Sequence, residues 1–398
     1  MGSLLGQGAQ GGNINGGSPG PPNIWGLYGL PLTRKSDWRG GPIKILTWKR
    51  VIEQKRNQGN HKWLAAKFLD HNATINAPKL IPQDYRVIAV DGSHIDVDRH
   101  SPIKCVVLNI GTVIFTYGSN PSAILNSSPL TYIGDSELNI FDGNSTSRSP
   151  LQGNLMGVKR AVMELKFLAD TLEDYADGTP TLALIDGSLI LWSILGEQEY
   201  VIDQLLQEQF LEQLYRIKKL SDKKVILASY LSYPDTSDVI NSLRICLCNE
   251  HCSNMNPCEQ GCSLVSGIRD RDIFIKYLPD SSRSSLFQST SNVIEKYYGE
   301  EYGINFYYLN IFNEIARIEL PNWTANNLDL LELSHSLIID QCNKGLGYPV
   351  SIMESHEQAV INTTDRENFK MLLDRLLAEQ GINYNTSQKD RSKKYRWV

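Results

Sequence analysis

Two hydrophobic patterns alternate along most of this chain. Short, continuous apolar runs predict strands, and they occur at residues 87–90, 104–117, 182–185, 224–229 and, as two strands closed by Pro321, 304–320. Apolar residues at helical spacing predict helices at residues 47–69, 155–175, 200–220, 237–247, 328–342, 351–361 and 365–380. Strands that alternate with helices through short connections predict an α/β protein, with a mixed β-sheet flanked by helices and helical additions at both ends.

Polar stretches interrupt this pattern. Residues 1–22 are rich in Gly, Ser, Asn and Pro and are predicted to be a disordered leader, because little apolar surface there offsets the entropy of ordering. The Asn-, Ser- and Pro-rich stretch that follows residue 117 predicts a loop. Basic residues gather at 34–67, with two interleaved tryptophans, and again at 389–396. Each basic stretch either contacts phosphate or is an ordinary solvated surface, and the solvated surface is the commoner arrangement.

Composition narrows the class of protein. With 398 residues, 41% of them hydrophobic and 21% charged, the chain can bury a core in one large or two moderate domains. A net charge of −5 argues against a protein that simply coats nucleic acid, but it does not exclude an enzyme whose basic residues are locally grouped. No run approaches the roughly 18 apolar residues of a membrane helix, and no secretory signal is recognisable. We therefore expect a cytoplasmic protein.

The cysteines are concentrated in one segment. Seven cysteines do not make a disulfide framework at this length, and the reducing cytoplasm is the default expectation. Five of the seven lie within residues 246–262, with a histidine among them, and could supply tetrahedral zinc ligands. Their spacings fit no standard zinc finger, so structural Zn²⁺ and an inserted loop with free thiols both stay open. The residues concerned are Cys246, Cys248, His251, Cys252, Cys258 and Cys262.

Two apolar runs end on the same tripeptide, Asp-Gly-Ser. The first run leads to Asp91 and the second to Asp186. Either tripeptide alone is as typical of a hairpin turn, with the glycine at positive φ, as of a metal site. Because two buried-type strands both end in this way, the repeat favours a pair of carboxylates at one edge of a sheet. Such a pair is what divalent-metal phosphoryl chemistry requires.

Two helices contribute further candidates. Glu164 lies at the margin of the apolar stripe of the helix at 155–175, between the two Asp-Gly-Ser motifs, and could reach the same sheet edge. The alternative is a surface pair with Arg160, one turn earlier, and helix geometry alone favours that pair. His356 shares the stripe of the helix at 351–361, where a lone histidine is more often a hydrogen-bonded core residue than a ligand.

Taken together and in order, these motifs resemble the NurA nuclease family. The matching segments are AVDGS at 89–93, K-R-x-x-x-E at 159–164, LIDGSL at 184–189, A-R-I-E-L-P at 316–321 and GYPVSIMESHEQAVI at 347–361. The resemblance implies an RNase H-like core and a manganese-dependent deoxyribonuclease, with exonuclease and endonuclease activity both open. It also implies a homodimer attached to a hexameric HerA-type ATPase, acting in DNA end resection and double-strand break repair.

The resemblance assigns roles to individual residues. Asp91, Glu164, Asp186 and His356 match the family's metal-site positions, and two Mn²⁺ ions held there would clamp a phosphodiester. Mg²⁺ is the alternative metal. Asp91 would be the bridging ligand, and His356 a nitrogen ligand or a positioner of water or phosphate. The remaining matches give less definite roles. Arg160 and Tyr348 are candidate DNA contacts, and Glu319 matches a family position without an assigned role.

The chain also departs from the family pattern and divides into four expected regions. The leader and the cysteine segment are not part of that pattern, and a basic residue expected after the third core strand is missing. The regions are the disordered leader at 1–22, a basic helical segment at 23–80, the nuclease domain at 81–361 and a C-terminal helix with a basic tail at 362–398. Two other functions stay open: a non-cutting scaffold subunit of a ring ATPase complex, and a metal-dependent phosphohydrolase that acts on small phosphate esters.

Overall fold

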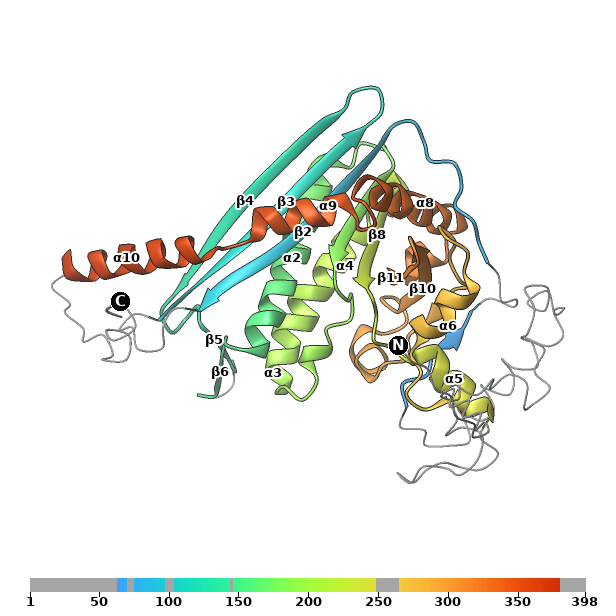
Figure 1. Cartoon of the computed structure of the whole chain (residues 1–398). Coiled ribbons are helices and arrows are strands. Elements are labelled where there is room, and N and C mark those ends of the chain that lie inside the picture. Colours follow the sequence, from blue (N-terminus) through green and yellow to red (C-terminus); the bar gives the residue numbers. More distant parts are fainter. Residues whose placement is uncertain (1–62, 70–74, 97–103, 144–145, 248–264, 380–398) are drawn as a thin grey trace, which may run out of the picture. The chain divides into compact units, whose positions relative to one another are not determined.

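The computed structural model describes residues 63–69, 75–96, 104–143, 146–247 and 265–379 (Figure 1). Within these ranges, nine strands form one mixed sheet in the order β1-β9-β10-β11-β8-β7-β2-β3-β4, and two short strands, β5 and β6, form a separate ribbon. The strands are β1 (Lys67–Phe68), β2 (Tyr85–Asp96), β3 (Cys105–Tyr117), β4 (Ser122–Ile133), β5 (Asn139–Phe141), β6 (Arg148–Pro150), β7 (Thr181–Asp186), β8 (Val225–Ser232), β9 (Phe287–Gln288), β10 (Ile304–Ile311) and β11 (Glu314–Pro321).

Five strands around β2 make the core of the sheet. β2, β3 and β4 form an antiparallel meander, after which helix α2 (Asn154–Tyr175) crosses over to β7. β7 pairs with the other edge of β2 and runs parallel to it, and β8 pairs with β7, also in parallel. A crossover of this kind is required between parallel strands, because a tight turn can join only antiparallel ones. The arrangement confirms the predicted α/β class and the RNase H-like core.

The remaining strands extend the sheet beyond β8. The hairpin β10–β11 joins through β11, which runs antiparallel to β8, and β9 and β1 complete this side. β1 corrects part of the sequence analysis, since residues 63–69 were expected to end a helix and contain a strand instead. The two strand residues, Lys67 and Phe68, pair with Gln288 and Phe287, and this cross-strand pairing overrides the local helical pattern. The rest of that expected helix lies outside the described residues.

Helices cover both faces of the sheet. Their bounds are α3 (Glu199–Ile202), α4 (Leu211–Lys218), α5 (Asp238–Leu247), α6 (Asp270–Tyr277), α7 (Asn322–Ala325), α8 (Leu328–Lys344), α9 (Val350–Ala359) and α10 (Thr363–Glu379), with a π-helical turn at Asp203–Phe210 between α3 and α4. Along β2, Ile88 and Val90 pack with α2 and α4, whereas Val87 and Ala89 pack with α8 and α9. This alternation follows from the two-residue period of a strand, and it separates the apolar core under α2 and α4 from the one under α8 and α9.

The edge strand β4 replaces a predicted loop. Its twelve residues pair with β3 from Ser122 opposite Thr116 to Ile133 opposite Cys105. Its half-buried side chains, Ile124, Ser128, Leu130 and Tyr132, all lie on one face, but the polar stretch at 126–129 interrupts the apolar alternation that could have revealed the strand. Its partner β3 is buried over ten consecutive residues and supplies the hydrophobic signal for the pair. Among the helices that the structure describes, none is long and apolar enough to cross a membrane.

Candidate active site

Asp91 and Asp186 lie side by side on neighbouring parallel strands. In the register of β2 and β7, Val90 is opposite Ile185, so the two aspartates are the next pair along. Their side chains point to the face that carries Ala89 and Leu184, because strand side chains alternate. Adjacent strands are about 4.8 Å apart, which brings the two carboxylates to one edge of the sheet, as the sequence predicts.

The two Asp-Gly-Ser motifs nevertheless have different local structures. After Asp186 the strand ends, and Gly187 turns the chain at φ 90°, where a side chain would be strained. After Asp91 the strand continues to Asp96, so the prediction that the first strand ends at its Asp-Gly-Ser motif is wrong. β2 stays extended because every residue from Tyr85 to Asp96 is paired with β3. Cross-strand pairing has overridden the turn preference of Asp-Gly.

Helix α9 brings His356 to Asp91. The Nδ1 atom of His356 lies 2.7 Å from Oδ2 of Asp91. Gly111, which is opposite Asp91 on β3, makes this approach possible, since a Cβ atom there would lie 2.2 Å from the carbonyl oxygen of Ser355. Asn109, two residues earlier on β3, donates from Nδ2 to the carbonyl oxygens of residues 358 and 359 at the end of α9. β3 therefore holds α9 directly over β2.

Glu164 reaches the same strand from the opposite face of the sheet. It is buried on α2 and accepts a hydrogen bond from the backbone N–H of Gly92. A Cβ atom on Gly92 would lie 2.6 Å from Oε1 of Glu164, so glycine leaves the space that this carboxylate occupies. Arg160 also pairs with Glu164, at 3.3 Å between Nε and Oε1. Glu164 thus forms the i,i+4 pair, although it is buried and not at the surface as that alternative supposed, and it also reaches the strand that carries Asp91.

Tyr348 completes the group from the loop before α9. Its hydroxyl donates a hydrogen bond to Asp186, and its ring packs edge-on against Tyr230, with 5.3 Å between centroids. Tyr230 is opposite Asp186 on β8, so the tyrosine pair covers the end of β7. Tyr348 was expected to be a candidate DNA contact, and the structure makes it a direct partner of a carboxylate.

The carboxylates influence one another's ionisation. Burial raises the pKa of Glu164 to about 8. The charge of Arg160 opposes this rise, and the charges of Asp91 and Asp186 add to it. Burial also raises the pKa of Asp186, an effect that the Tyr348 hydroxyl opposes and Asp91 strengthens. Neighbouring acids that oppose each other's ionisation favour the uptake of a proton or of a cation. The donor set of three carboxylates and one imidazole suits a divalent metal with mixed oxygen and nitrogen ligands.

The described side chains are not arranged as a closed metal cage. Among the residues that the structure places, no group of three or more His, Cys, Asp and Glu side chains is close enough together to hold an ion as it stands. His356 instead contacts Asp91, Glu164 pairs with Arg160, and Tyr348 binds Asp186. The donors fit a metal chemically, and each is bonded to a protein partner. The cysteine segment at 246–262, for which Zn²⁺ was considered, lies outside the described side chains.

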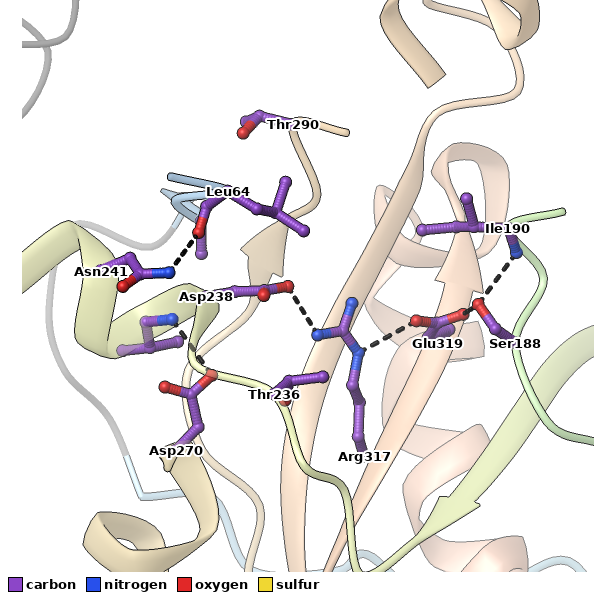
Figure 2. A network of polar contacts seen from close by, with 12 residues as sticks. Leu64, Ser188, Ile190, Thr236, Asp238, Asn241, Asp270, Thr290, Arg317 and Glu319 are labelled. Carbon is purple, nitrogen blue, oxygen red and sulfur yellow. Dashed lines mark hydrogen bonds and ion pairs between the residues drawn. The ribbon is translucent and has the colours of Figure 1, made fainter. Parts of the chain in front are cut away.

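A buried polar network supports the loop that follows Asp186 (Figure 2). Glu319 on β11 accepts hydrogen bonds from the Ser188 hydroxyl at 2.8 Å and from the Leu189 N–H at 3.0 Å. Its other oxygen pairs with Arg317, which in turn binds Asp238 at the start of α5. Sequence analysis had found Glu319 in a family motif without assigning it a role. The signal that could have assigned one is the alternation Arg-x-Glu in a strand, which places two charges on one buried face.

Comparison with known proteins identifies the family of this chain. A family model described as the NurA domain matches residues 85–361, the span that holds every residue of the site described above. The chain belongs to the NurA family. A search of curated protein sequences found no match.

Solved structures that resemble this NurA chain have low sequence identity to it. The NurA nuclease from Sulfolobus solfataricus is 12% identical, with a TM-score of 0.42 over 87% of this chain and 96% of that one. The catalytic domain of human endonuclease V is 13% identical, with a TM-score of 0.32 over 86% and 99%. An endonuclease V from Ciona intestinalis in complex with DNA is 9% identical, with a TM-score of 0.32 over 83% and 98%.

Proposed function

We propose that this NurA family chain is a manganese-dependent nuclease that hydrolyses phosphodiester bonds at DNA ends. The observation that carries the proposal is the convergence of Asp91, Asp186, Glu164 and His356 at one edge of the sheet, from β2, β7, α2 and α9. Membership of the NurA family supports a nuclease.

Each residue has a distinct task in this proposal. Asp91 lies between the other donors, in contact with His356 and beside Asp186, so it would bridge two ions. Glu164 and Asp186 would complete the two sites, and His356 would supply a nitrogen ligand or position the phosphate. A divalent metal, when bound, polarises the phosphate and makes a bound water nucleophilic near neutral pH. Mn²⁺ suits this mixed oxygen and nitrogen donor set, and Mg²⁺ is the alternative.

The protein's own cations and hydroxyls would act around the metal. Arg160 is partly exposed and lies next to Glu164, where its guanidinium can bind a phosphate oxygen of the DNA. Tyr348 holds Asp186 through its hydroxyl, which fixes the orientation of that carboxylate. Both residues were candidate DNA contacts from the sequence. The partly exposed guanidinium of Arg160 supports that role, whereas the bond from Tyr348 to Asp186 supports a role in orienting the carboxylate.

Cleavage of end-labelled linear DNA tests the proposal. The purified chain is assayed with Mn²⁺, with Mg²⁺ and with a chelator, beside Asp91→Ala and Asp186→Ala. Asp222→Ala, which removes an exposed carboxylate from a surface turn, is the matched control. We expect cutting that requires metal, disappears in the two site variants and persists in the control. Metal-dependent cutting that survives in Asp91→Ala would refute the site. Cleavage of a small phosphate ester in preference to DNA would point to a phosphohydrolase instead.

The proposal extends to partners and regions outside the site. We propose that the chain works as a cytoplasmic homodimer with a hexameric HerA-type ATPase in DNA end resection and double-strand break repair. The nuclease domain would span residues 81–361, close to the family match at 85–361. Adding the ATPase to the cleavage assay tests the partnership. A chain that binds the ATPase but cuts DNA neither alone nor with the ATPase would favour a scaffold subunit. Zinc analysis of the purified chain tests the cysteine segment.

A further inference from the structure

The network around Glu319 is a chain of buried charges that ends at the loop after Asp186. Arg317 and Glu319 are each 1% exposed, and Asp238 is 5% exposed. Arg317 and Glu319 lie on the side of β11 that faces away from α8, because Ala316, Ile318 and Leu320 occupy the α8 side. Asp238, at the start of α5, meets Arg317 on that side. Figure 2 shows Arg317 between the two carboxylates, with Ser188 beyond Glu319. Burial would lower the pKa of Arg317, and the two carboxylates raise it above its ordinary value.

The contacts of Glu319 are divided between its two oxygens. Oε1 accepts from Nε of Arg317 at 3.0 Å, whereas Oε2 accepts from both the Ser188 hydroxyl and the Leu189 N–H. Ser188 and Leu189 come directly after Asp186 and Gly187, where the chain has just left strand β7. Gly187 donates its own N–H to the Tyr230 carbonyl oxygen at 3.1 Å, but it has no side chain to restrict its backbone, so the turn that follows relies on further contacts. Glu319 supplies two of them.

Ser188 also holds later residues of the loop through hydrogen bonds. Its Oγ atom accepts hydrogen bonds from the backbone N–H of Ile190 at 3.0 Å and from the Trp192 indole at 3.3 Å. Its own hydroxyl proton goes to Glu319. The segment that follows Asp186 is thereby anchored to β11, two strands away from β7 in the sheet.

The far end of the network is anchored as well. Asp238, the first residue of α5, accepts from Nη1 of Arg317 at 2.8 Å. Asp270 accepts from the backbone N–H groups of Val239 and Ile240 and so caps the same helix. The guanidinium of Arg317 also lies over the ring of Phe306, at 3.7 Å from its centroid. Arg317 is therefore fixed on three sides, and Glu319 has a rigid support on the side away from the loop.

We infer that Glu319 is a positioning residue, which holds the Ser188–Leu189 turn and through it sets the orientation of the Asp186 carboxylate. The inference rests on the proposed function, in which Asp186 is a metal ligand. Glu319 itself contacts neither Asp91 nor Asp186 and is too buried to touch substrate. Groups that orient metal ligands typically change metal affinity or activity about ten- to a hundred-fold when they are mutated.

Glu319→Gln is the decisive substitution. A glutamine side chain has one acceptor oxygen and one amide nitrogen, so either Arg317 or the Leu189 N–H must face another donor. The fold should tolerate the change, because Arg317 keeps Asp238 as a counter-charge and the buried pair stays neutral. Ser188→Ala is a second, milder variant, which removes one of the two contacts between Glu319 and the loop and leaves all three buried charges in place.

Asp238→Asn provides the matched control. It removes one charge from the opposite end of the same network, at similar burial, and leaves both contacts of Glu319 to the loop intact. A purely structural role for the network predicts that Asp238→Asn and Glu319→Gln behave alike. A positioning role predicts that the two lose similar stability but differ in metal binding.

The experiment measures Mn²⁺ binding by calorimetry and, separately, the Mn²⁺ concentration that gives half-maximal DNA cleavage. In Glu319→Gln and in Ser188→Ala we expect the Mn²⁺ affinity to fall about ten-fold and the half-maximal Mn²⁺ concentration to rise about ten-fold, with KM for DNA unchanged. In Asp238→Asn we expect both quantities to stay at the wild-type level. Wild-type Mn²⁺ affinity in both Glu319→Gln and Ser188→Ala would overturn the inference, and so would an equal loss in Asp238→Asn. A wild-type chain that binds Mn²⁺ without cutting DNA would refute the proposed function while the calorimetry still decides the role of Glu319. A wild-type chain that binds no Mn²⁺ would overturn both.

Discussion

His356 Nδ1 and Asp91 Oδ2 lie 2.7 Å apart, although 265 residues separate them in the sequence. One comes from the late helix α9 and the other from the first long strand of the core. Their contact depends on the close packing of α9 on β3, where Gly111 leaves room for the helix backbone. The imidazole is largely exposed and the carboxylate is mostly buried, so the pair lies at the boundary between the core and the solvent.

Gly111→Ala should displace α9. The new Cβ atom would lie 2.2 Å from the Ser355 carbonyl oxygen and 2.5 Å from the Ala359 nitrogen, and backbone atoms of a packed helix cannot turn aside. We expect a loss of about 2 kcal/mol in the free energy of unfolding and a large fall in DNA cleavage, because His356 moves away from Asp91. Chemical denaturation and the end-labelled DNA assay measure the two effects.

Gly157→Ala is the control for that substitution. Gly157 lies within α2, and a Cβ atom there would meet nothing within 4 Å. Alanine is the better helix former, so this variant should gain about 0.5–1 kcal/mol and keep its activity. Equal stability losses in Gly111→Ala and Gly157→Ala would show that the packing of α9 against β3 is not the cause.

Gly92→Ala should separate activity from stability. Its Cβ atom would lie 2.6 Å from Glu164 Oε1 and 2.9 Å from Arg160 Cγ, which belong to flexible side chains. Glu164 can swing away at a cost of about 1 kcal/mol, but it then leaves the edge of the sheet where Asp91 lies. We predict a small shift in the melting temperature together with a strong loss of metal-dependent cleavage. Full activity in this variant would exclude Glu164 from the site.

Tyr348→Phe should impair cleavage without unfolding the chain. The ring can stay packed against Tyr230, while Asp186 loses the hydrogen bond from the hydroxyl. A group that orients a ligating carboxylate is expected to change activity about ten-fold or more. Comparison of kcat and the melting temperature between wild type and variant measures this. A parallel fall in the melting temperature by many degrees would instead assign the hydroxyl to the stability of the loop.

His335 should make the free energy of unfolding depend on pH. Burial on α8 lowers the pKa of His335 from 6.5 to about 4, against the raising effect of its hydrogen bond to the Ser281 carbonyl. The unfolded chain therefore takes up a proton below pH 6.5, whereas the folded chain does so only near pH 4. Protons favour unfolding in this window, and stability should fall by about 3 kcal/mol as the pH drops through it.

Denaturant titrations at several pH values, in the presence of chelator, measure that dependence. His335→Gln stays neutral throughout the window and keeps an N–H donor, so its stability should vary less with pH than that of the wild type. A variant with the same slope between pH 6.5 and 4 would show that other groups produce the effect.

The central strands and helices were predictable because their apolar patterns have a physical cause in the two cores. The runs that became β2, β7 and β8 are buried on both faces, and α2 carries a clear apolar stripe. The edge strand β4 was missed because the polar stretch at 126–129 interrupts the apolar positions on its one half-buried face. β1 was missed because its pairing with β9 is a tertiary effect that local propensity does not contain.

Most of the proposed site followed from motif order and family resemblance, but its construction did not. The sequence placed Asp91 and Asp186 at one sheet edge, which the parallel register of β2 and β7 explains. It could not show that Glu164 approaches from the other face past Gly92, or that α9 packs on Gly111. Both facts concern the space left where a side chain is missing, and a glycine in a sequence does not say which neighbour will fill it.

The long separation between Asp91 and His356 also has a consequence during protein synthesis. The ribosome releases β2, α2 and β7 well before α9, so a nascent chain carries its three acidic residues without the histidine. The contact between His356 and Asp91 can form only when nearly the whole family domain has been made. Prematurely terminated chains would then lack the assembled site, and incomplete translation products would not expose the cell's DNA to a working nuclease.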